Sequence, residues 1–209
     1  MRPHHRIAIA LLLTAATGCG LTSHSHSPER KPPAMNMQQG ADRADVILGQ
    51  TLSAIKPELR WLHGPSTDAS CGDDPNAPEG TGTVDRRIQI QTIVSEARRG
   101  SLLGIVERDW RARGYRITNV NSNKRFPSVV AFTPDNFSVE VSVGGEGQFF
   151  FSVTTPCFTR TAVAAPATRP NTAEREGQYP LRPHIHDDFW SAPTPGGPSP
   201  QQPSPNASR

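Results

Sequence analysis

The clearest pattern in the chain is an alternation of apolar and polar residues through its central part. Val84, Ile88 and Ile90 alternate with polar residues, and Arg86 falls in phase with the apolar side chains. A period of two residues is typical of a half-buried antiparallel strand. Similar patterns predict strands over residues 58–63, 84–94, 115–121, 128–133, 137–143 and 148–155.

The last two predicted strands are joined by Gly144 to Gly147, which indicates a hairpin turn. Phe149 and Phe151 share one face of the strand that follows, and we expect them in the core. Phe150 points to the opposite face.

Two segments have helical spacing instead. Apolar residues recur at intervals of about four between residues 41 and 56, with Asp42 and Asp45 in the first turn, where the helix dipole favours acidic groups. Pro57 follows and ends this helix. A second helix is expected over 101–113, with Gly114 placed to cap its C-terminus.

Runs of strands with two helices, and no alternating strand–helix series, predict the α+β class. We expect a domain over residues 41–159 with an antiparallel sheet of about five to six strands and two helices on one face. Residues 64–82 consist almost entirely of turn-forming residues and predict a long loop.

The ends of the chain have a different composition. Residues 19–40 are polar and proline-rich and predict a flexible tether. Residues 160–209 contain ten of the 21 prolines and predict a disordered tail that is dispensable for folding. Phe189 and Trp190 interrupt this tail, but two apolar residues among prolines seldom offset the entropy of ordering such a segment.

Composition excludes several classes of protein. Only 34% of residues are apolar, mean hydropathy is −0.52, and no apolar run is long enough to cross a membrane. The formal net charge is +3 with basic and acidic residues mixed, so no basic surface favours nucleic acid as a partner.

The first 19 residues are the most specific signal. Arg2 and Arg6 precede a short apolar run, as in a secretory signal peptide over residues 1–18. Ala16-Thr17-Gly18-Cys19 resembles the bacterial lipobox, although the position of Ala16 usually holds leucine. We therefore expect Cys19 to be the lipidated N-terminus that anchors an exported protein to the outer face of the cell membrane. An ordinary signal peptide with an incidental cysteine is the alternative.

Lipidation of Cys19 would leave Cys71 and Cys157 as an even pair. Exported chains oxidise such pairs, so we expect a disulfide worth up to about 4–5 kcal/mol in the chain-entropy model. Two buried thiols or half of a metal site are the alternatives.

Candidate chemistry is sparse. His184 and His186 have imidazoles two residues apart and are candidate metal ligands, but chance spacing in a tail explains them as well. Arg98, Arg99, Arg111 and Arg113 could contact an anionic lipid or wall polymer, although a solvated helix face is the simpler interpretation. The predicted domain contains only His63 and no nucleophile motif, so we expect no enzyme, no catalytic residue and no cofactor.

Several short motifs carry a resemblance. They include Thr51 to Pro57 followed by Trp61, Arg99 to Glu107 followed by Trp110 and Gly114-Tyr115, and later Thr133-Pro134-Asp135. Over most of residues 45–155 the chain is similar to exported actinobacterial lipoproteins of uncharacterised function. The resemblance implies a location and a fold, and no catalytic residues.

Two function classes remain. The first is a non-enzymatic binding or interaction module, held by its lipid and able to contact a cell-wall or protein partner. The alternative is a small-ligand carrier or sensor with a pocket between sheet and helices, which a cavity above about 300 Å³ would favour.

Overall fold

The structure is a computed structural model that describes residues 34–72 and 77–195. All of them belong to one compact unit of the chain, residues 32–209. The predicted signal peptide, Cys19 and most of the predicted tether lie outside the described residues.

Eight strands form one antiparallel sheet in the order β1-β3-β7-β6-β5-β4, with β2 and β8 also paired to β3. The elements are α1 (Met37–Ser53), β1 (Trp61–His63), β2 (Thr67–Ser70), β3 (Thr81–Ile90), α2 (Glu96–Ala112), β4 (Arg116–Asn121), β5 (Ser128–Phe132), β6 (Ser138–Val143), β7 (Phe149–Thr154) and β8 (Phe158–Thr159).

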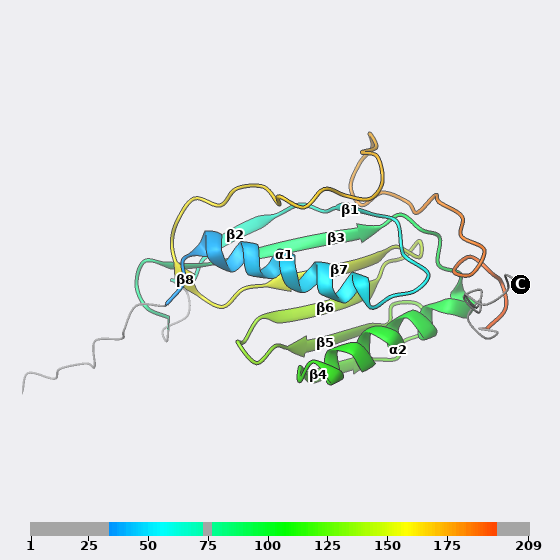
Figure 1. Ribbon diagram of the computed structural model, residues 1–209, viewed down its shortest axis with the longest axis horizontal. Coiled ribbons are helices and arrows are strands. Elements are labelled where there is room, and N and C mark those ends of the chain that lie inside the picture. The colour runs from blue at the N-terminus through cyan, green and yellow to red at the C-terminus, as the bar shows by residue number, and fades with distance from the viewer. Residues whose placement is uncertain (1–33, 73–76, 196–209) are drawn as a thin grey trace, which may run out of the picture. The chain divides into compact units, whose positions relative to one another are not determined.

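Both helices cover the same face of this sheet (Figure 1). The core lies between them and the sheet, and Phe149 and Phe151 are buried in it as predicted. Trp110 of α2 is also buried and donates its Nε1–H to Thr51 Oγ1 of α1 at 3.0 Å, which joins the two helices. The predicted α+β class is therefore confirmed, with more strands than the five to six expected.

The extra strands are short. Beta-2 lies inside the predicted loop 64–82, and its four residues are all exposed, so it has no apolar alternation to reveal it. Beta-8 has only two residues. Pairing with β3, and not the local pattern, makes these segments extended.

Both helices begin earlier than the sequence pattern predicts. At the start of α1, Asn36 Oδ1 accepts from the backbone N–H of Gln39 at 2.9 Å, and Gln39 Oε1 accepts from the N–H of Asn36 at 3.0 Å. This capping box places Met37 and Gly40 in the helix, and not in the predicted tether. In α2 the helix runs through Gly100, where the sequence suggested a boundary.

The predicted disorder of the C-terminal tail is wrong for residues 161–195. This segment passes along the outer edge of the sheet beside β1 and then reaches the start of α2 (Figure 1). Asn171 Oδ1 accepts from the N–H of Trp61 at 2.8 Å, and Asn171 Nδ2 donates to Leu59 O at 2.9 Å. The tail therefore satisfies backbone groups along the β1 edge that would otherwise be open to other chains.

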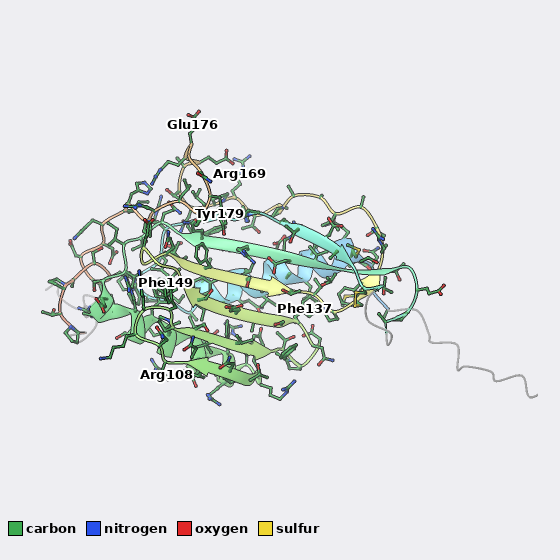
Figure 2. All side chains as sticks on the ribbon, turned by 180° about the vertical axis from the view of Figure 1, so that it is seen from behind. Arg108, Phe137, Phe149, Arg169, Glu176 and Tyr179 are labelled. Atoms are coloured by element: carbon green, nitrogen blue, oxygen red, sulfur yellow. A yellow bond between two sulfur atoms is a disulfide. The ribbon has the colours of Figure 1, made fainter. Side chains whose placement is uncertain are left out.

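Neither of the two helices formed by residues 34–72 and 77–195 covers the back face of the sheet. Figure 2 shows this face with Tyr179 lying across it, where its ring is 6.2 Å from that of Phe150. Gln89, only 1% exposed, exchanges side-chain hydrogen bonds with the backbone of Leu181. The outward position of Phe150 is thus explained by the tail, which covers this part of the face.

Residues 184–192 are here called the C-terminal strap. Ile185 forms a parallel bridge with Thr92, and the N–H of Ser95 donates to Trp190 O at 2.9 Å. Trp190 is 0% exposed, and its Nε1–H donates to Pro57 O at 2.8 Å. One completely buried indole and a run of backbone hydrogen bonds supply the stabilisation that composition alone did not indicate.

Candidate functional site

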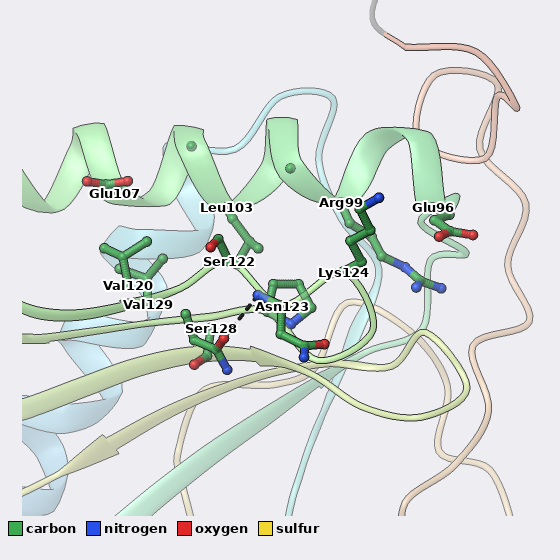
Figure 3. Close-up of a pocket in the computed structure, with 14 residues that line it drawn as sticks. Glu96, Arg99, Leu103, Glu107, Val120, Ser122, Asn123, Lys124, Ser128 and Val129 are labelled. Carbon is green, nitrogen blue, oxygen red and sulfur yellow. Dashed lines mark hydrogen bonds between the residues drawn. The ribbon is translucent and has the colours of Figure 1, made fainter.

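The main candidate site is a groove of about 400 Å³ beside α2, here called the α2 groove (Figure 3). One wall is α2, and the other consists of β4, the first residues of β5 and the loop between these strands. The space between the helices and the centre of the sheet is filled by core side chains, so the groove lies at the side of the domain core.

The helical wall is one face of α2. The lining positions follow one another at alternating intervals of three and one residues, namely Glu96, Arg99, Gly100, Leu103, Gly104 and Glu107. A methyl group built on Gly100 would meet nothing within 4 Å, and one on Gly104 would meet only the mobile end of Arg108. Glycine costs about 1 kcal/mol relative to alanine inside a helix, so here it leaves space at a cost in stability.

The groove has an apolar floor. Leu103 and Val129 are 8% and 2% exposed and belong to the core, while Val120 of β4 is 50% exposed. An exposed valine beside buried apolar side chains is surface that a ligand could cover.

Charged side chains occupy both ends of the groove. Arg99 and Lys124 lie at the end near Glu96, and Glu107 lies at the other end (Figure 3). Glu107 forms an ion pair with Arg111, which lies one turn further along the helix, at an N–O distance of 2.7 Å.

The loop that carries Lys124 is ordered by side chains of its own. Asn121 Oδ1 accepts from the N–H of Asn123, and Asn123 Oδ1 accepts from the N–H groups of Arg125 and Phe126 at 2.8 and 3.0 Å. Asparagine bonds to nearby backbone groups are typical of tight turns. They support the turn that carries Lys124 into the wall of the groove.

The predicted disulfide is present. Cys71 and Cys157 are bonded, with their Cα atoms 6.2 Å apart and a sequence separation of 86. The bond connects the end of β2 to the segment before β8, far from the α2 groove. Cys71 is only 7% exposed, which is typical of a structural disulfide.

The two candidate metal ligands are not brought together with others. His184 and His186 lie on the exposed side of the strap, and the nearest carboxylate to His186 is Asp188 at 3.8 Å. Within residues 34–72 and 77–195, no group of three histidine, cysteine or acidic residues is placed to hold a metal ion.

The expectation of a solvated face is wrong for one arginine. Arg98 is only 5% exposed, and its guanidinium lies 4.2 Å from the ring centre of Phe189 in the strap. Arg111 and Arg113 pair with Glu107 and Asp109 on their own helix, as exposed arginines commonly do.

His63 is the histidine that the predicted domain contains. His63 bonds through Nε2 to the carbonyl oxygen of Thr168 at 2.7 Å, so its ring is engaged by the tail.

The sequence interpretation missed the α2 groove. The available signal was the pair of glycines four residues apart, Gly100 and Gly104, within a segment otherwise suited to a helix. Their significance depends on what α2 packs against, and helical spacing alone does not give that.

Among residues 34–72 and 77–195, no helix has the length and hydropathy required to span a bilayer. Comparisons extend the picture no further: the chain matches no family model, no curated protein and no solved structure.

Proposed function

We propose that the protein is a non-enzymatic binding module, lipid-anchored at Cys19 to the outer face of the cell membrane, which binds its ligand in the α2 groove. The observation that carries the binding function is the groove itself. Its volume of about 400 Å³ lies within the range of small-molecule sites. The anchor rests on the sequence of the first 19 residues.

The composition of the groove supports binding. Apolar side chains form its floor, while Arg99, Lys124 and asparagine side chains stand around it. Binding sites usually combine an apolar surface with a few polar groups that orient the ligand. The glycines of α2 leave the room that a ligand needs.

A small-ligand carrier is the second candidate, since the cavity exceeds the volume of about 300 Å³ that favours it. A carrier must shield its cargo from water, however, and the α2 groove is partly open to solvent. The open form favours a module that holds a ligand, or the end of a larger molecule, at the surface.

Ligand-detected NMR with a library of small acidic, basic and neutral compounds tests whether the α2 groove binds anything. Gly100→Phe places a ring in the open space of the groove. We expect this variant to lose binding of the compounds that bind the natural chain. Gly49→Phe is the matched control, because a side chain at this exposed glycine of α1 also meets nothing within 4 Å. Compounds that bind both variants equally would place the site elsewhere and overturn the proposal.

A further inference from the structure

We propose that the α2 groove is selective for a single-chain amphipathic anion, that is, an oxyanion head group on a short apolar chain. This inference rests on the proposed function, because it names the class of ligand for the same groove. It follows from the position of two cationic side chains relative to the apolar floor.

Arg99 and Lys124 are the cations at one end of the groove. No carboxylate among the described residues lies within 4 Å of either, whereas six other arginines pair with acidic side chains. Arg99 Nε is buried and has no hydrogen-bond partner among those residues. Two cations without partners at one end of a cavity are complementary to an oxyanion.

The position of Arg99 is restricted by a turn. Its Nη2 lies 2.7 Å from the place where a β-carbon on Gly147 would stand, and Gly147 has a positive φ of 81°. The absence of a side chain at Gly147 therefore lets the guanidinium pack against the β6–β7 turn. A guanidinium held in this way loses less conformational entropy when it binds an anion.

The acidic groups nearby do not neutralise these cations by contact. Glu146, beside Gly147, is paired with Arg182, and Glu107 is paired with Arg111. Glu96 lines the same end of the groove but lies more than 4 Å from both cations, since it forms no ion pair in the described structure. Glu96 would disfavour a second anionic group beside the first, which suits a ligand with a single head group.

The rest of the groove suits a short apolar chain. From the cationic end, a ligand would pass the open space at Gly100 and Gly104 and cover Val120, which is half exposed. Covering apolar surface contributes about 25 cal/mol per Å². The head group supplies the selectivity and the chain supplies much of the affinity.

Isothermal titration of the full chain with octyl phosphate, below its micelle concentration, tests the inference. Octyltrimethylammonium and inorganic phosphate are the control ligands, lacking the negative charge and the apolar chain respectively. We expect saturable one-to-one binding of octyl phosphate, and at least about tenfold weaker binding of both controls. Lys124→Gln should weaken octyl phosphate about tenfold and reduce its salt dependence.

Arg125→Gln is the matched control variant, because Arg125 is the next residue in the loop, stacks on Phe126 and does not line the groove. Arg99→Gln should act like Lys124→Gln, and Arg99→Lys should restore part of the affinity. If the Arg99 variants do not fold, Lys124→Gln still decides the question.

Equal binding of octyl phosphate and octyltrimethylammonium, or equal effects of Lys124→Gln and Arg125→Gln, would overturn the inference. Sedimentation of the chain with phosphatidylglycerol vesicles that depends on Lys124, without binding of octyl phosphate, would also overturn it, since the anion would then belong to a bilayer. The proposed function would survive these results if other compounds still bound the groove and were lost in Gly100→Phe.

Discussion

Arg86 shows at the scale of one residue how a charge is accommodated in the core. It lies in β3, in phase with apolar neighbours, and is only 1% exposed. Its guanidinium is 3.4 Å from Asp45 of α1 and donates to Ser66 Oγ and to Ala164 O, both at 2.7 Å. One side chain thereby joins α1, the sheet and the C-terminal segment.

Asp45→Asn should lower the free energy of unfolding by about 1–3 kcal/mol, because it leaves the buried guanidinium without its counter-ion. The loss should be smaller than for an ideal buried pair, since burial raises the pKa of Asp45 although Arg86 opposes the shift. Urea unfolding at neutral pH measures this loss in the free energy of unfolding. The double variant Arg86→Met/Asp45→Asn should recover part of the loss, and a double variant less stable than Asp45→Asn would contradict this account.

Asp135 should make stability depend on pH in the acidic range. Burial tends to raise its pKa, but hydrogen bonds from Thr133 and its own backbone N–H, together with Arg43, outweigh burial and lower the pKa below the ordinary value of 3.8. The folded state therefore favours the carboxylate. Its contribution is present above pH 3.8 and is lost as the pH falls through the lower folded pKa.

Asp135→Asn should accordingly destabilise the protein at neutral pH by a modest amount, because the carboxylate is partly exposed and screened. The difference from the natural chain should shrink below about pH 4. Urea unfolding between about pH 2 and 7 measures this. A difference that stays constant over this range would show that the carboxylate charge plays no part.

At the scale of elements, the C-terminal strap is the segment whose role differs most from the sequence prediction. The strap lies beside the connection between β3 and α2. Ser95 Oγ donates to Ala192 O in the strap and makes no capping hydrogen bond to α2. Arg98 is buried beneath Phe189 of the strap, and Trp190 of the strap is buried in the core. Truncation near Arg160 should therefore reduce stability, contrary to the dispensability that proline content suggested.

Trp190→Ala should cost about 3–5 kcal/mol, because it removes a completely buried indole and leaves Pro57 O without a donor. Asp188→Ala, at a fully exposed side chain two residues away, should change stability by less than about 0.5 kcal/mol. Thermal and urea unfolding compare the two variants. Equal stability of both would mean that the strap is not docked in solution.

At the scale of the whole molecule, the proposed function depends on where the chain is held. Cys19→Ser should abolish membrane attachment and yield protein that is released or remains unprocessed, because no acyl chains can be added. Fractionation of cells and medium measures this. Ala16→Leu, which restores the usual lipobox residue, should stay with the membrane. A processed Cys19→Ser protein that still fractionates with membranes would contradict the anchor.

The parts of the fold whose burial is periodic could be predicted from the amino-acid pattern alone. The strands β4 to β7 lie within one residue of their predicted bounds, because alternation records which face of a sheet is covered. The pattern also predicted that Arg86 points inward, because it falls in phase with the apolar residues of its strand. The count of cysteines predicted the pairing of Cys71 with Cys157.

The remaining features depend on contacts between segments that are far apart in the sequence. Beta-2, the C-terminal strap and the α2 groove owe their form to partners that are distant in sequence, such as β3 for β2 and Pro57 for Trp190. Proline-rich composition correctly indicates a low content of regular structure, but order in an irregular segment depends on whether its few large side chains find a place in the core. Gly100 likewise gains its meaning from the β4–β5 wall opposite it, because a missing side chain makes a cavity only where another surface closes the space.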